Sequence, residues 1–176
     1  LPGYGDLELA RPSIIFISYN FTDGGPDACQ GINAAHTAVI RVIDGRSCQQ
    51  HANIATPLAI PSSSLAVGDL TGDGVAEIVA ARVGGGLVAW QQNDQGSFDT
   101  LWETASTFGS DVCNWAGPSL HDLNNDGVPE VLLHGAVFSS SGALITNALG
   151  TLNSGISTGY IPVVADVDID GAPELV

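Results

Sequence analysis

Short runs of apolar, β-favouring residues alternate with polar turns along the chain, and this pattern predicts strands rather than helices. Beyond residue 60 the runs fall into two sets of four, separated by turns rich in Gly, Asn, Asp and Ser. The predicted strands are 65–67, 78–81, 86–90 and 101–104 in the first set, and 118–120, 131–133, 136–138 and 143–146 in the second. Each set predicts one sheet of four antiparallel strands.

The first sixty residues show the same pattern less completely. Residues 13–19 and 37–43 are apolar and β-branched, and they predict the second and third strands of an earlier unit. Asp44 and Gly45 follow directly and predict a hairpin turn. Another apolar run, 161–165, begins a further unit near the end of the sequence.

An acidic segment recurs three times without gaps, at 69–79, 122–132 and 166–176, with offsets of 53 and 44 residues. Each copy lies between two predicted strands. Repeats of this length with strand-rich flanks are typical of β-propellers, in which one repeat forms one four-stranded blade. We therefore expect an all-β fold made of propeller blades.

The spacing of the repeats divides the chain into units. We expect a degenerate blade without an acidic loop at 6–56, blades with acidic loops at 60–105 and 112–150, and the start of a further blade at 160–176. This makes about three and a half blades, whereas closed propellers have about four to eight. We expect the chain to be a segment of one larger propeller domain, completed by missing sequence or by further chains.

Oxygen-bearing side chains occupy positions 1, 3, 5 and 9 of each acidic loop, and Gly occupies position 6. A hard cation such as Ca²⁺ takes six to eight oxygen ligands, and Gly allows the chain to bend sharply between them. The carbonyl of position 7 is the expected backbone ligand. The predicted metal ligands, up to three Ca²⁺ in all, are Asp69, Thr71, Asp73, Val75 and Glu77; Asp122, Asn124, Asp126, Val128 and Glu130; and Asp166, Asp168, Asp170, Ala172 and Glu174.

The acidic loops have two other interpretations. An EF-hand requires Glu at position 12 and flanking helices, but Ala80 and Leu133 occupy that position within apolar runs. Metal-free polar turns are the second alternative. The loops contain ten of the nineteen acidic residues of the chain, and so many close carboxylates would repel one another without a cation.

The pattern Asp-x-[Asp/Asn/Thr]-x-Asp-Gly-x-x-Glu, followed by an apolar strand, resembles the FG-GAP/VCBS repeat of integrin-α-like β-propellers, which are common in secreted bacterial proteins. The resemblance is close over 60–176 and weak over 6–56. It implies calcium in the loops, a propeller of six to eight blades and an extracellular role in adhesion or ligand binding. Thr71, a neutral residue at position 3, and the missing loop of the first unit depart from the pattern.

Charge and composition exclude several classes of function. The net charge is −15 with only four Lys and Arg, so a nucleic-acid partner is not expected. No apolar run is long enough to insert into a membrane. The three cysteines form no zinc pattern, and Cys29 and Cys48 are a candidate disulfide that the spacing neither requires nor excludes.

The sequence favours a secreted or cell-surface module, stabilised by calcium, that binds an extracellular protein or carbohydrate and is not an enzyme. Trp115, in a predicted loop, is the preferred ligand contact, whereas Trp90 and Trp102 lie in strands and are assigned to the core. One alternative is a calcium-dependent polysaccharide lyase or hydrolase built on a propeller. Another is a subunit of a surface filament, since unpaired strand edges favour association.

Overall fold

The computed structural model describes residues 12–19, 37–104, 117–147, 163–171 and 173–175, and these residues contain strands and turns but no helix. The all-β prediction is therefore confirmed for this part of the chain. The described residues therefore provide no helix that is long and apolar enough to cross a membrane. The strands are β1 (Ser13–Tyr19), β2 (Ala38–Asp44), β3 (Gln50–Thr56), β4 (Leu65–Gly68), β5 (Glu77–Ala81), β6 (Leu87–Gln92), β7 (Phe98–Glu103), β8 (Ser119–His121), β9 (Glu130–Leu133), β10 (Ala136–Phe138), β11 (Leu144–Asn147), β12 (Val164–Ala165) and β13 (Glu174–Leu175).

The strands form four antiparallel sheets in which each strand pairs with the next one along the chain. Their orders are β1-β2-β3, β4-β5-β6-β7, β8-β9-β10-β11 and β12-β13. The two four-stranded sheets contain the eight strands predicted beyond residue 60. Strand β3 was not predicted, because its first residues, Gln50 and His51, are polar.

The β2–β3 hairpin is longer than the predicted two-residue turn, since the strands end at Asp44 and resume at Gln50. Asp44 organises the turn: its Oδ1 accepts hydrogen bonds from the backbone N–H groups of Ser47 at 2.7 Å and Arg46 at 2.9 Å. These bonds, led by that from Ser47, lower the pKa of Asp44. The turn is therefore closed by a side chain as well as by its backbone.

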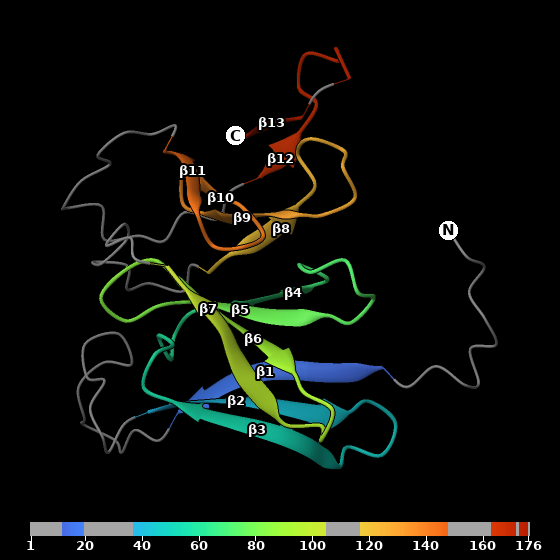
Figure 1. Ribbon diagram of the computed structural model, residues 1–176, viewed down its shortest axis with the longest axis vertical. Helices are drawn as coiled ribbons and strands as arrows, with labels where there is room; N and C mark the ends of the chain where they lie inside the picture. The colour runs from blue at the N-terminus through green and yellow to red at the C-terminus, as the bar shows by residue number, and fades with distance from the viewer. Residues whose placement is uncertain (1–11, 20–36, 105–116, 148–162, 172, 176) are drawn as a thin grey trace.

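The first three sheets stack face to face in chain order (Figure 1), and apolar side chains fill the spaces between them. Strand β5 shows why: all its residues are buried, and successive side chains point to opposite faces. Ile78 and Ala80 pack toward the first sheet, whereas Val79 and Ala81 pack toward the third. A sheet buried on both faces requires such a continuous apolar strand.

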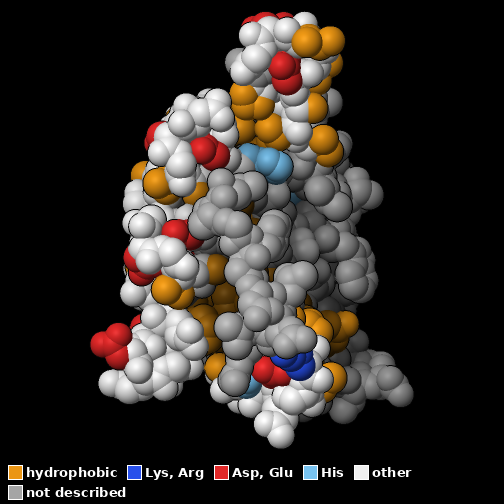
Figure 2. All heavy atoms as spheres, turned by 90° about the vertical axis from the view of Figure 1, so that its right-hand side faces the viewer, with side chains coloured by type: hydrophobic (Ala, Val, Ile, Leu, Met, Phe, Trp, Pro, Cys, Tyr) orange, Lys and Arg blue, Asp and Glu red, His pale blue; other side chains and the backbone are white. Residues whose placement is uncertain are grey.

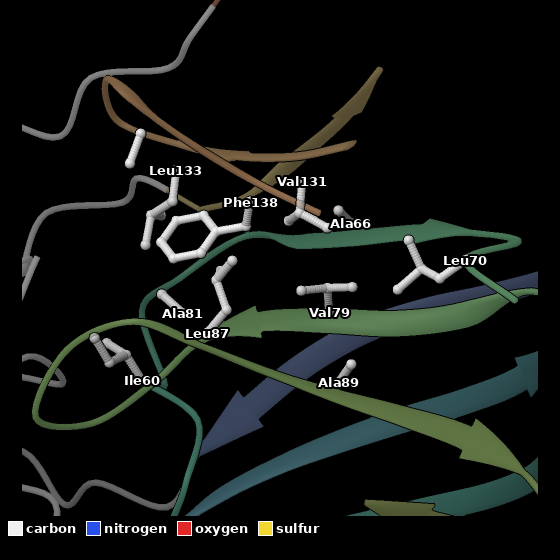
Figure 3. Packing of buried hydrophobic residues seen from close by; sticks show 11 residues of the cluster. Ile60, Ala66, Leu70, Val79, Ala81, Leu87, Ala89, Val131, Leu133 and Phe138 are labelled. Carbon is white, nitrogen blue, oxygen red and sulfur yellow. The ribbon is translucent and has the colours of Figure 1, made fainter. Parts of the chain in front are cut away.

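The second and third sheets share a core that includes Leu70, Val79, Leu87, Leu133 and Phe138 (Figure 3). At its edge, Trp102 of β7 donates a hydrogen bond from Nε1 to the carbonyl of Ser140, at 2.9 Å. Gly142 lies under the same indole, where a Cβ would come within 2.6 Å of the ring. The third sheet is thus fixed to the second by a specific polar contact as well as by its core.

Trp90 and Trp102 differ in their surroundings. Trp90 is fully buried between the first and second sheets, which confirms its assignment to the core. Trp102 is only partly buried and packs against the edge of the core between the second and third sheets. Its indole N–H is satisfied there by the Ser140 carbonyl, as a partly buried Trp requires.

Candidate metal centres

The three acidic loops occupy equivalent places in the fold. They connect β4 to β5, β8 to β9 and β12 to β13, the first two strands of three successive sheets. The loops after β4 and β8 project from the same side of the stack, and the loop after β12 lies beyond them (Figure 1). We refer to them as loop 1 (69–77), loop 2 (122–130) and loop 3 (166–174).

The Asp at position 1 organises each loop by accepting backbone hydrogen bonds across it. In loop 1, Asp69 accepts from the N–H groups of Gly72, Asp73 and Gly74 at 2.7, 3.2 and 2.8 Å. Asp122 and Asp166 accept from positions 5 and 6 in the same manner. These bonds are Asp126 N to Asp122 at 3.0 Å, Gly127 N to Asp122 at 2.9 Å, Asp170 N to Asp166 at 3.0 Å and Gly171 N to Asp166 at 3.0 Å.

These hydrogen bonds change the acidity of Asp69. The bond from the Gly74 N–H is the largest influence, and it holds the pKa of Asp69 below its ordinary value. N–H donors favour the charged carboxylate. Asp69 is thus kept ionised and available to a cation.

Two positions of each loop adopt the left-handed backbone conformation. At position 6 the residue is always Gly, with φ of 85°, 90° and 91° in loops 1, 2 and 3. Position 4 is also left-handed, at Gly72, Asn125 and Ile169. Gly and Asn tolerate this conformation, but a β-branched residue is strained in it. The Gly at position 6 was predicted from the sequence. The left-handed conformation at position 4 was not, although Gly72 and Asn125 indicate it.

The Glu at position 9 ties the end of each loop to its beginning. Its Oε2 accepts a hydrogen bond from the backbone N–H of position 2. The distances are 2.7 Å for Leu70 to Glu77, 2.8 Å for Leu123 to Glu130 and 2.8 Å for Val167 to Glu174. Position 9 was predicted only as a metal ligand, and the structure gives it this second role.

Burial disfavours the ionised form of Glu77. The residue is almost completely inaccessible to solvent. Burial raises the pKa of Glu77, and the nearby charges of Asp73 and Asp69 raise it further, while the N–H of Leu70 opposes the shift. Three carboxyl groups therefore converge where a positive charge would stabilise their ionised forms.

Oxygen atoms also converge in loops 2 and 3. In loop 3, Asp166, Asp168 and Glu174 each offer a carboxylate oxygen within 4.8 Å of the other two. In loop 2, the Asn124 Nδ2 donates to Asp126 Oδ2 at 3.0 Å and to Glu130 Oε1 at 3.2 Å. The Asn124 amide thus brings the carboxylates of Asp126 and Glu130 to one side chain. The side chains at positions 1, 3, 5 and 9 all carry oxygen atoms, the ligand type that Ca²⁺ prefers.

The remaining predicted residues are placed as follows. Thr71 and Val75 are exposed in loop 1, and Val128 is half-buried in loop 2. The N–H groups of Val75 and Val128 donate to Asp73 and Asp126, each at 2.8 Å. Ala172, Trp115 and Cys29 lie outside the described residues. Cys48 is exposed in the β2–β3 hairpin and forms no disulfide within the described part, so its pairing with Cys29 stays a prediction.

A known protein family contains a repeat similar to the acidic-loop repeat of this chain. Residues 69–133, which contain loops 1 and 2, match the family model of the FG-GAP-like repeat. The resemblance inferred from the acidic loops is thus confirmed for this segment. The chain has no significant match among curated proteins.

Among solved structures, the chain is similar to the crystal structure of the V. cholerae biofilm matrix protein Bap1, with 18% identity and a TM-score of 0.34. The match covers 92% of this chain and 34% of that protein. The chain therefore spans about a third of the length of the protein it matches.

Proposed function

We propose that loops 1, 2 and 3 each bind one Ca²⁺ and that the bound ions stabilise a repeat module of the FG-GAP type. The observation that carries the proposal is the carboxylate cluster of loop 3, in which Asp166, Asp168 and Glu174 offer oxygens within 4.8 Å of one another. Loops 1 and 2 repeat the backbone hydrogen bonds that shape loop 3. The match of residues 69–133 to the FG-GAP-like repeat supports the same assignment.

Each position of the loop has its own task in this proposal. The carboxylates at positions 1 and 9 already hold backbone N–H groups through one or both oxygens, so the loop is shaped before the ion enters. Positions 3 and 5 supply the more exposed oxygens, and the carbonyls of Val75, Val128 and Ala172 complete the proposed set. Bound Ca²⁺ supplies positive charge that offsets the repulsion among the carboxylates.

We further propose that the four sheets are propeller blades, with units at 6–56, 60–105, 112–150 and 160–176. Two observations support this architecture: each full sheet is a four-stranded meander, and the first three sheets stack through apolar faces. Both are features of propeller blades. The calcium loops would then fasten the first two strands of each blade.

The proposed biological role is extracellular adhesion or binding of a protein or carbohydrate, without catalysis. Extracellular calcium modules bind their ions with dissociation constants of about 0.1 to 1 mM, a range suited to loops exposed to solvent. The hydrogen bonds of the acidic side chains also support a structural role for them, as opposed to a catalytic one. Those at positions 1 and 9 accept N–H groups of their own loops. Trp115 remains the proposed ligand contact.

Isothermal titration calorimetry tests the metal sites directly. We expect about three Ca²⁺ per chain, and about one fewer in each of the variants Asp69→Ala, Asp122→Ala and Asp166→Ala. Asp94→Asn removes an exposed acid outside the loops and is the matched control, with unchanged stoichiometry. Absence of binding at saturating calcium, or equal losses in the control, would reject the proposal.

A further inference from the structure

Loop 2 carries an amide at position 3, and both polar atoms of this side chain are engaged within the loop. The Oδ1 of Asn124 accepts the backbone N–H of Asp126 at 2.9 Å. Its Nδ2 donates to Asp126 Oδ2 at 3.0 Å and to Glu130 Oε1 at 3.2 Å. One neutral amide thus provides hydrogen-bond donors to the carboxylates of both position 5 and position 9.

The neighbouring groups fix the orientation of this amide. If its oxygen and nitrogen were exchanged, the oxygen would face two carboxylate oxygens and the nitrogen would face the N–H of Asp126, so attractive contacts would become repulsive. The amide therefore presents its positive end to the carboxylates, as a cation does. Glu130 is buried, where a carboxylate oxygen without a donor is costly in free energy.

Loop 3 has a carboxylate at the equivalent position. Asp168 Oδ1 accepts the N–H of Asp170 at 3.2 Å, which repeats the contact between Asn124 and Asp126. The carboxylate of Asp168 has no donor to offer, and its oxygen lies within 4.8 Å of oxygens of Asp166 and Glu174. Position 3 therefore makes the same backbone contact in both loops but presents opposite charge to the other acidic side chains.

The Asn124 side chain can leave its partners without disturbing the core. Asn124 and Asp126 are exposed, and only Glu130 of the three residues is buried. Figure 2 looks onto the side from which loops 1 and 2 project, and it shows acidic side chains at the surface at several levels of the molecule. A cation can therefore reach these carboxylates from solvent as the amide moves away.

We propose that the Asn124 amide replaces the cation in calcium-free loop 2 and that calcium displaces its Nδ2 from Asp126 and Glu130. This role rests on the proposed calcium sites, and it makes position 3 the residue that sets how strongly a loop depends on calcium. Loop 2 keeps two of its carboxylates paired without the ion. It therefore needs calcium less, and binds it more weakly, than loop 3, which carries four carboxylates and no amide.

Exchanging the residues at position 3 tests this proposal through the thermal midpoint in excess chelator and in saturating calcium. Asn124→Asp should lower the midpoint in chelator by at least about 3 °C, because repulsion replaces two hydrogen bonds to carboxylates. Saturating calcium should remove most of this loss. Asp168→Asn should do the reverse, raising the midpoint in chelator and reducing the increase that calcium produces.

Calorimetric titration of loop 2 alone gives the affinity. In a chain that carries Asp69→Ala and Asp166→Ala, only the loop 2 site remains, and circular dichroism establishes that this chain is folded. Adding Asn124→Asp should lower the dissociation constant of the remaining site about tenfold, because calcium gains a charged ligand and no longer displaces a donor.

Asn93→Asp is the matched control. Asn93 lies in the β6–β7 hairpin, outside the acidic loops, and its Oδ1 accepts the backbone N–H groups of Gln95 and Ser97. Its Nδ2 donates to Asp99 Oδ2 at 3.0 Å. The same exchange of amide for carboxylate should therefore lower the midpoint equally in chelator and in calcium.

Failure of the metal sites and failure of the displacement by calcium give different results. Absence of calcium binding in the unaltered chain would reject the metal sites, and the displacement with them. Calcium binding together with an unchanged chelator midpoint in Asn124→Asp would leave the metal sites standing and overturn the role of Asn124. Equal losses with and without calcium, as in Asn93→Asp, would overturn it as well.

Discussion

Loops 1 and 3 share one pattern of backbone hydrogen bonds but differ in how much of each loop is buried. In both, the Asp at position 1 accepts the N–H of the position 6 Gly, and the Glu at position 9 accepts the N–H of position 2. In loop 1, Leu70 is buried in the core shared with the third sheet and Glu77 is also buried. Loop 3 is exposed, carries a fourth carboxylate at Asp168 and has a strained residue at position 4.

This difference separates two sources of loop stability. The hydrogen bonds within each loop are common to both, so they set its shape. Packing of position 2 and position 9 adds stability only where a following sheet covers them. We therefore expect loop 1 to depend mainly on its core contacts and loop 3 to depend more strongly on calcium.

The largest expected effect is at position 2. Leu70→Ala should lower the free energy of unfolding by about 3 kcal/mol, because it leaves a cavity in the core between the second and third sheets. Val167→Ala, at the equivalent exposed position, should change it by less than about 0.5 kcal/mol. Urea unfolding of both variants measures the difference. Equal effects would contradict the assignment of position 2 to the inter-sheet core.

The next effect concerns position 9 in the absence of calcium. Glu77→Ala should destabilise the chain by about 2 kcal/mol in excess chelator, because the N–H of Leu70 loses its acceptor in a buried place. Glu174→Ala should lower the free energy of unfolding by less, because the backbone N–H of the exposed Val167 can donate to water instead. Urea unfolding in chelator isolates this effect from metal binding. A larger loss in Glu174→Ala would reverse the proposed difference between the loops.

The smallest effect is at position 4. Ile169→Asn should raise stability by about 0.5 to 1 kcal/mol, because Asn tolerates the left-handed conformation and the exposed Ile side chain packs against little. The reciprocal change in loop 2, Asn125→Ile, should lower stability by a similar amount. Thermal unfolding of the pair checks this prediction, and a stabilising Asn125→Ile would refute it.

Much of the fold could be predicted from the sequence because the strand pattern and the turn residues agree. The eight strands of the two four-stranded sheets and the positions of the three loops follow from apolar runs bounded by Gly, Asn and Asp. Strand β3 was missed because its polar start hides the alternation that buries Ile54 and Thr56. Its pairing with β2, and not its own composition, makes it a strand.

The loop residues show a similar division. The spacing of oxygen-bearing residues included the three carboxylates that gather in loop 3, and the Gly at position 6 predicted the bend. The full ligand set of each loop stays a prediction. The hydrogen bond from position 2 to position 9 could not be read from spacing, since it depends on how the two ends of the loop meet. Leu70 shows this most clearly: it resembles an ordinary loop residue in sequence, yet it joins the metal loop to the core.

The central claim is that calcium stabilises these loops, and the thermal midpoint with saturating calcium or with excess chelator tests it most directly. Calcium at one hundred times its dissociation constant should add about 2.7 kcal/mol per occupied site, or roughly 5 to 10 °C per site for a chain of this length. We predict a large upward shift that is reduced in Asp122→Ala and Asp166→Ala. An unchanged midpoint at saturating calcium would contradict the account.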